Sequence, residues 1–272
     1  MKPYYLYEKE ELLQHTLMPL QYFADNEAIF EAMADEMIAI IQRNNERQEA
    51  TVMICPVGPV GQYPFFVKKV NAQQVNLRNT WFINMDEYLT DDKEWIDIEH
   101  RLSFRGFMKR NVYNLIESHL VMPENQRIFP NPQQLDEIPR IIARLGKVDA
   151  CFGGIGINGH VAFNEPDTSL AAKDFCALPT RVLQIDSMTQ AINAVGDLNG
   201  AIEEMPRYCV TIGMREILQA QQIRLGVFRD WHRAVLRRAA CGEVTTFFPV
   251  TLLRQHQDIR LYFSEHVATI NW

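Results

Sequence analysis

The feature that most constrains the fold is an alternation of short apolar runs with longer segments that suit helices. The runs are almost continuously apolar and end in turn-forming residues, which is typical of strands buried on both faces. They lie at residues 51–55, 80–84, 148–152, 208–212, 223–228 and 259–263. Helix-length segments lie between them, at residues 26–42, 101–116, 133–145, 214–220 and 232–241. This alternation predicts an α/β fold, with a mainly parallel sheet and helices on both of its faces.

The size of the chain sets how many domains it can form. It has 272 residues, of which 47% are hydrophobic, and this suits one large domain or two small ones. The sequence shows no repeat at a fixed period and no linker rich in Gly, Pro and Ser. We therefore expect a single α/β domain over residues 1–272.

The charge and cysteine content argue against several classes of protein. The net charge is −7 and Lys and Arg form no long block, so binding to nucleic acid or to an anionic membrane is not expected. The five cysteines are dispersed and form no CxxC pair, and no His, Asp and Cys cluster has metal-ligand spacing. The N-terminal segment has no apolar signal-peptide core. We expect a cytoplasmic protein with no disulfide framework, no metal and no membrane segment.

Three of the predicted strands end in residues that can carry chemistry. Residues 51–55 run into the glycine- and proline-rich segment 56–61, residues 80–84 into Asp86 and Glu87, and residues 148–152 into the sequence GGIGINGHVAFNEP. In open parallel sheets, ligands bind beyond the carboxyl ends of the strands. The sequence therefore predicts one site at this edge of the sheet.

The segment 154–159 has the spacing GxGxxG but not the context of a dinucleotide-binding loop. That loop must open a helix, and Pro166 would interrupt a helix that began at Gly159. No acidic residue ends an apolar strand at the required distance. We expect no dinucleotide and no other cofactor.

The same segment favours a histidine at the mouth of the sheet. Its glycines allow a close approach of the backbone, and Glu165 can fold back onto the ring of His160. A carboxylate on one ring nitrogen leaves the other free for proton transfer. Asp86 and Glu87 add a candidate general base, because a carboxylate in such a crevice can be partly desolvated. Two plainer interpretations stay open: His160 satisfies a turn, and Asp86 caps a turn or a helix.

Together these residues resemble the glucosamine-6-phosphate deaminase family, which is related to the 6-phosphogluconolactonases. The resemblance is carried by NMDEY at 84–88, by GGIGINGHVAFNEP at 153–166 and, more weakly, by MPRYCVTIGMREIL at 205–218. It extends over residues 20–265, and the sequence after the Gly-His pair favours the deaminase side. It implies a modified Rossmann-type fold, a metal-free isomerisation of an amino sugar with release of ammonia, and a homo-oligomer.

The resemblance also implies roles for individual residues. Asp86 would transfer a proton between C2 and C1, and His160 would open the sugar ring with Glu165 as its supporting carboxylate. Asn158 stands where the family usually has Asp, and it cannot supply that residue's negative charge. The remaining candidates would bind the substrate, a sugar or sugar phosphate: Gly58, Gly61, Glu87, Gly154, Arg229 and His232.

The phosphate-binding part of the family pattern is altered. Val57 and Val60 replace hydroxyl side chains in the loop, and Pro59 removes a backbone donor. The family's phosphate-binding Arg is missing from residues 189–195, and its Lys falls near His232. Unless Arg181, Arg229 or Arg233 compensates, we expect a substrate other than ordinary glucosamine 6-phosphate.

Two other functions stay open at this point. A hydrolase of sugar lactones would need no proton transfer at C2, and a non-catalytic sugar-binding regulator would fit Asn158 and the altered loop. Two structural expectations accompany them. Arg237 and Arg238 are expected on the solvated face of the helix at 232–241, and the aromatic residues at 63–66 in the core.

Overall fold

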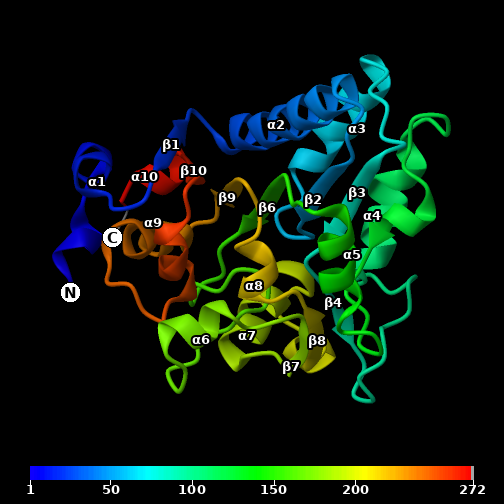
Figure 1. Cartoon of the computed structure of the whole chain (residues 1–272). Helices are drawn as coiled ribbons and strands as arrows, with labels where there is room; N and C mark the ends of the chain where they lie inside the picture. Colours follow the sequence, from blue (N-terminus) through cyan, green and yellow to red (C-terminus); the bar gives the residue numbers. More distant parts are fainter. Residues whose placement is uncertain (271–272) are drawn as a thin grey trace.

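The computed structural model of the chain describes residues 1–270 and contains two sheets (Figure 1). The larger sheet has seven strands in the order β1-β10-β9-β6-β2-β3-β5, and every neighbouring pair is parallel. The strands are β1 (Leu20–Phe23), β2 (Thr51–Cys55), β3 (Thr80–Asn84), β5 (Arg127–Ile128), β6 (Ala150–Gly154), β9 (Ile223–Val227) and β10 (Ile259–Ser264). The prediction of a mainly parallel sheet is confirmed.

Helices cover both faces of this sheet, as the sequence predicted, and each face has its own core. Strand β2 shows the division, since Val52 and Ile54 belong to one hydrophobic cluster, and Met53 and Cys55 belong to the other. The first cluster takes in α1 (Lys9–His15), α5 (Glu137–Leu145), α8 (Met214–Ile217), α9 (His232–Cys241) and α10 (Glu265–Ala268). The second takes in α2 (Asn26–Glu46), α3 (Gln62–Ala72) and α4 (Phe104–Asn111). The expected core position of the aromatic segment is confirmed, because Tyr63 and Phe66 are fully buried.

The smaller sheet was not predicted. It is antiparallel, in the order β4-β8-β7, and consists of β4 (Asp86–Leu89), β7 (Arg181–Gln184) and β8 (Tyr208–Thr211). The apolar run at 208–212 was expected in the parallel sheet and instead forms the middle strand of this one. Figure 1 shows the small sheet together with α6 (Ala172–Cys176) and α7 (Ser187–Asp197) along the lower side of the view.

Two helices begin later than predicted, at positions set by a proline and by an N-capping serine. Helix α5 begins at Glu137, so that Pro139 lies in its first turn, where a missing N–H costs little. The segment 101–116 is divided between α4, which begins after the N-cap Ser103, and a 3-10 turn at Tyr113–Leu115. Four further 3-10 segments occur at Pro3–Leu6, Glu124–Gln126, Ile202–Glu204 and Pro249–Gln255.

Arg237 corrects the expectation of a solvated face on α9. Its side chain is 1% exposed and donates hydrogen bonds to the backbone carbonyls of Tyr7, Arg233, Val267 and Ala268. It therefore ties the N-terminal segment to the end of the chain. Arg238 is half-buried, with its guanidinium 4.2 Å from the ring centroid of Phe248.

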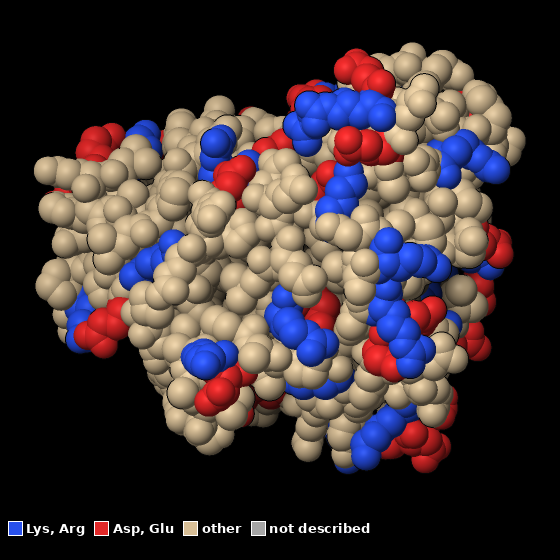
Figure 2. Space-filling view, viewed as in Figure 1, with Lys and Arg blue, Asp and Glu red and all other residues tan. Residues whose placement is uncertain are grey.

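The surface carries charges of both signs. Figure 2 shows basic and acidic side chains interspersed over one face of the molecule, with no extended area of one sign on that face. None of the helices within residues 1–270 has both the length and the apolar character that crossing a membrane requires.

Candidate active site

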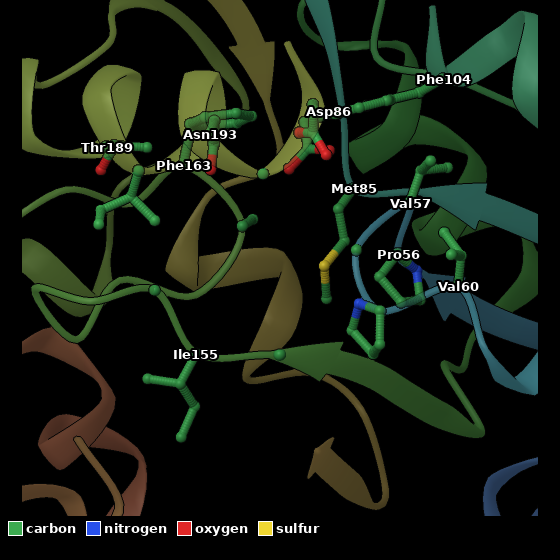
Figure 3. A pocket seen from close by; sticks show the side chains of 18 of the residues that line it. Pro56, Val57, Val60, Met85, Asp86, Phe104, Ile155, Phe163, Thr189 and Asn193 are labelled. Atoms are coloured by element: carbon green, nitrogen blue, oxygen red, sulfur yellow. The ribbon is translucent and has the colours of Figure 1, made fainter. Parts of the chain in front are cut away.

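A cavity of about 620 Å³ lies where the carboxyl ends of β2, β6 and β9 meet the start of β4. This volume suits a small molecule such as a sugar. In Figure 3, Asp86, Phe163, Thr189 and Asn193 lie on one side, and the loop residues Pro56, Val57 and Val60 lie on another. Seven of the ten candidate residues line it: Gly58, Gly61, Asp86, Gly154, His160, Arg229 and His232.

Asp86 is held at the cavity by the small sheet. It is the first residue of β4 and pairs with Thr211 of β8, and its side chain is 7% exposed. Among the described residues, none donates a hydrogen bond to its carboxylate. Burial, followed by the negative charge of Glu87, raises the pKa of Asp86 well above its ordinary value. A carboxylate in this state is a stronger base than one in water.

Glu87 is placed differently from what the sequence led us to expect. Neighbouring residues of a strand point to opposite sides, and the carboxylate of Glu87 is fully buried beneath the start of α4 rather than at the cavity. It accepts hydrogen bonds from the backbone N–H groups of Phe104 and Arg105 and from the hydroxyl of Ser103. Arg105 also pairs with it, Nε to Oε2, at 3.1 Å. This geometry makes Glu87 a cap of α4 and places it outside the residues that line the cavity.

His160, Asn158 and Glu165 form one connected group. The ring Nδ1 lies 2.7 Å from Oδ1 of Asn158 and 3.1 Å from Oε2 of Glu165. The amide of Asn158 donates to the same Oε2 at 2.7 Å, which turns its oxygen toward the ring. The two nearest neighbours of Nδ1 are thus acceptors, and the hydroxyl of Thr189 lies farther away at 3.4 Å. Nδ1 therefore carries the proton, and Nε2 is left as the basic nitrogen. Asn158 and Glu165 do not line the cavity but lie behind His160.

Glu165 remains ionised in this environment. Burial alone would raise its pKa, but the charge of His160 and hydrogen bonds from His160, Asn158 and Thr189 together lower it below its ordinary value. A negative charge behind the ring stabilises the imidazolium that forms when Nε2 takes up a proton. His160 therefore still has a carboxylate beside it although Asn158 replaces the family's Asp, because Glu165 contacts the ring directly.

Two glycines of the segment 154–159 explain why it is rich in glycine. A side chain at Gly156 would overlap the ring of His160, so the absence of a Cβ lets the imidazole lie against the backbone. Gly159 has a φ of +84°, and a Cβ there would press against the ring of Phe248. Residues 155–166 form turns and no helix, as expected from Pro166.

His232 is at the cavity wall, but its ring is fully engaged with the backbone. It is 2% exposed, and Nδ1 accepts hydrogen bonds of 2.8 Å from the N–H groups of Phe228 and Arg229. Nε2 then carries the proton and donates to the carbonyl of Ile155 at 2.9 Å. Burial lowers the pKa of His232 to about 3, so the ring is neutral.

Several cavity residues were missed by the sequence analysis. They come from α7 and from the segment before α4: Thr189, Ile192, Asn193, Asp197 and Arg101. Asn193 donates to the hydroxyl of Tyr88, another cavity residue, at 3.1 Å. The N-cap Asp186, whose side chain accepts from the N–H of Met188, was a readable signal for α7. The resemblance aligned residues 189–195 with a phosphate-binding segment, but it assigned no residue there because the family's Arg is missing.

The chain was also compared with known proteins. No family model matches it. The glucosamine-6-phosphate deaminase of Bacillus pumilus is 26% identical over 248 residues, which cover 88% of this chain and 96% of that protein. The glucosamine-6-phosphate deaminase of Histophilus somni is 30% identical over 213 residues, which cover 76% of this chain and 74% of that protein.

Solved structures show the same fold. A monomeric glucosamine-6-phosphate deaminase superimposes with a TM-score of 0.80 at 21% identity, covering 93% of this chain and all of that one. A 6-phosphogluconolactonase from Shewanella baltica gives a TM-score of 0.64 at 12% identity, covering 91% and 97%. The fold is thus shared with both groups of enzymes, whereas the sequence similarity is to the deaminases.

Proposed function

The chain belongs to the glucosamine-6-phosphate deaminase family, and from this premise we propose that it isomerises and deaminates an amino sugar. The overall reaction converts a 2-amino aldose and water into a ketose and ammonia. The observation that carries the proposal is the pairing of two different bases at one cavity. Asp86 is a buried carboxylate with no hydrogen bond from the described chain, and His160 presents Nε2 with Glu165 behind it.

His160 would open the sugar ring. In a cyclic amino aldose, Nε2 takes the proton of the C1 hydroxyl and returns a proton to the ring oxygen, so the C1–O bond to that oxygen breaks. The ring of His160 is charged between these two transfers. Glu165 at 3.1 Å from Nδ1 stabilises that charge, and Asn158 holds both partners in place.

Asp86 would then move a proton along the open chain. Its carboxylate takes the proton from C2 and delivers it to C1, while the oxygen on C1 takes a proton from the substrate's ammonium group. This leaves a hydroxyl group at C1 and a protonated imine at C2. Water adds to that carbon, the C–N bond breaks and ammonia leaves, giving the ketose. The raised pKa of Asp86 suits both halves of this step, because the group must accept a proton and then give it back.

The proposal is tested by measuring ammonia release from a panel of amino sugars, each with and without a 6-phosphate. We expect wild type to release ammonia from at least one compound and Asp86→Asn to lose that activity by several powers of ten. Asp91→Asn is the matched control, since Asp91 is an exposed partner of Arg207 outside the cavity, and it should turn over normally.

Two results would refute the assignment. If no amino sugar yields ammonia although some of them bind, the chain is not a deaminase. If Asp86→Asn keeps full activity on a sugar lactone, proton transfer at C2 is not needed and the lactone hydrolase is the better description.

A further inference from the structure

The residues that line the cavity indicate the chemistry of the part of the substrate that lies away from C1 and C2. This inference rests on the proposed function, because C1 and C2 must then lie at Asp86 and His160. The other carbons extend toward the remaining walls, which include the loop after β2 and the turn before α9. Both places lie at the start of a helix, α3 and α9, where backbone N–H groups and the helix dipole would hold an anion such as a phosphate.

The loop before α3 offers a phosphate no polar or charged side chain. Its wall is made by the aliphatic carbons of Val57, Pro59 and Val60, and Pro59 has no N–H. The side-chain amide of Gln62 is turned away from a ligand, because it donates to the carbonyl of Pro59 at 2.9 Å. No hydroxyl or cationic side chain belongs to residues 56–61.

Two backbone donors of the turn before α9 are already occupied. The N–H groups of Phe228 and Arg229 converge on Nδ1 of His232, at 2.8 Å each, where a phosphate oxygen would otherwise lie. The other nitrogen of His232 is held by the carbonyl of Ile155. Aromatic rings surround this corner, with Trp231 at 3.9 Å and Phe228 at 5.4 Å from the His232 ring.

The cations that line the cavity gather at one place, beside the C-terminal end of α7. Within residues 1–270 these are Arg101 and Arg229, both exposed, and both lie at the C-terminal end of α7. Arg101 donates to the carbonyl of Asp197, and the guanidinium of Arg229 lies against Gly196. The carboxylate of Asp197, which also lines the cavity, offsets part of their charge.

We propose that the enzyme acts on a hexosamine whose C6 end is uncharged, and that Val57, Val60 and His232 determine this preference. His232 does so by taking the two backbone donors for itself. The two valines do so by presenting methyl groups where hydroxyl groups could donate to phosphate oxygens. Hydrogen bonds to a charged group are worth about 1.5–3 kcal/mol each, which corresponds to about tenfold or more in affinity per contact.

The first measurement compares D-glucosamine and D-galactosamine with their 6-phosphates, in kcat/KM for ammonia release and in the shift of the melting temperature. We expect the free sugars to exceed the phosphates by about tenfold or more in kcat/KM and to give the larger thermal shift. Preference for the phosphates in either measurement overturns the inference. Free sugars that bind without releasing ammonia support the inference and refute the proposed function, whereas no binding by any sugar refutes both.

Two variants test the residues themselves. Val57→Thr combined with Val60→Thr keeps the side-chain volume and adds two donors, so the ratio of phosphorylated to free sugar in kcat/KM should rise by about tenfold or more. An unchanged ratio contradicts the role of the valines. Arg229→Gln should leave the same ratio unchanged, and a selective loss with the phosphates would show that Arg229 binds a phosphate after all.

Discussion

Asp86 combines its proposed catalytic role with a cost to stability. Its pKa is raised in the folded protein, so the folded state disfavours the ionised form that the unfolded chain adopts freely. The destabilisation is absent below the ordinary Asp pKa, grows as pH rises toward the raised value and is complete above it. We therefore expect Asp86→Asn to raise the melting temperature at pH 8, with the difference shrinking toward zero at pH values near 3.

The raised pKa of Asp86 should also limit kcat/KM at low pH. Asp86 acts as a base only when ionised, so kcat/KM of wild type should fall on the acid side with an apparent pKa clearly above that of an ordinary aspartate. Thermal melts test the expected stability of Asp86→Asn, and pH–rate profiles test the expected fall of kcat/KM at low pH. A lower melting temperature for Asp86→Asn at pH 8, or a rate that stays flat to pH 4, would contradict this account of Asp86.

Gly156 shows how one absent Cβ can make room for the ring of His160, the proposed ring-opening group. In Gly156→Ala the new methyl group would overlap the imidazole of His160, and that ring can move aside more easily than the backbone. We expect kcat to fall at least tenfold, because Nδ1 then leaves Asn158 and Glu165, while the melting temperature changes little. Circular-dichroism melts beside ammonia-release kinetics give both values.

Gly146→Ala is the matched control for Gly156→Ala. Gly146 ends α5 with a φ of +73° and has open space around its Cβ position. Alanine there costs about 1–2 kcal/mol of stability through strain alone and should leave kcat unchanged. A Gly156→Ala enzyme that is destabilised but fully active would show that the ring does not depend on this contact.

At the scale of elements, Glu87 links the small sheet to α4. Replacing Glu87 by Gln removes the charge that pairs with Arg105 and disturbs the acceptor of two helix N–H groups. Breaking a buried ion pair in this way should cost about 3 kcal/mol or more in the free energy of unfolding. Urea titration measures it. Loss of substrate affinity with no loss of stability would instead restore the substrate-binding role that the sequence first suggested.

The sequence predicted correctly those elements whose burial gives them a recognisable run of apolar residues. Residues 51–55 and 80–84 are almost continuously apolar because helices cover both faces of the large sheet, and their predicted bounds are those of β2 and β3. Strand β4 could not be found this way, since it begins with two buried carboxylates that no apolar pattern would place in a strand.

In the candidate site, too, some residues could be predicted from local sequence and others could not. His160, Asn158 and Glu165 are close in sequence, so a motif can contain them and their contact is local. Asp86 precedes His160 by 74 positions in the printed sequence and meets it at the cavity only through the sheet. Thr189 and Asn193 lie on a helix that has no motif of its own, and the resemblance marked residues 189–195 only for a missing Arg. Their place depends on how α7 packs over the small sheet, which no local pattern expresses.

At the scale of the whole molecule, one chain supplies every wall of the cavity described here, from the loop after β2 to α7 and the start of α9. The resemblance predicted a homo-oligomer, and a monomeric deaminase shares this fold with a TM-score of 0.80. Because Asp86, His160 and Glu165 all come from the same chain, association should not be needed to assemble the proposed catalytic group.

We therefore expect turnover per chain to stay constant on dilution through the range in which any oligomer dissociates. Sedimentation velocity gives the state of association at each concentration, and ammonia release measured at the same concentrations gives the activity. Wild type and the destabilised Gly146→Ala should behave alike, which separates dissociation from unfolding. Activity that falls in step with dissociation would mean that a second copy supports the walls of the cavity, most directly at α7, whose Met188 and Val195 are exposed.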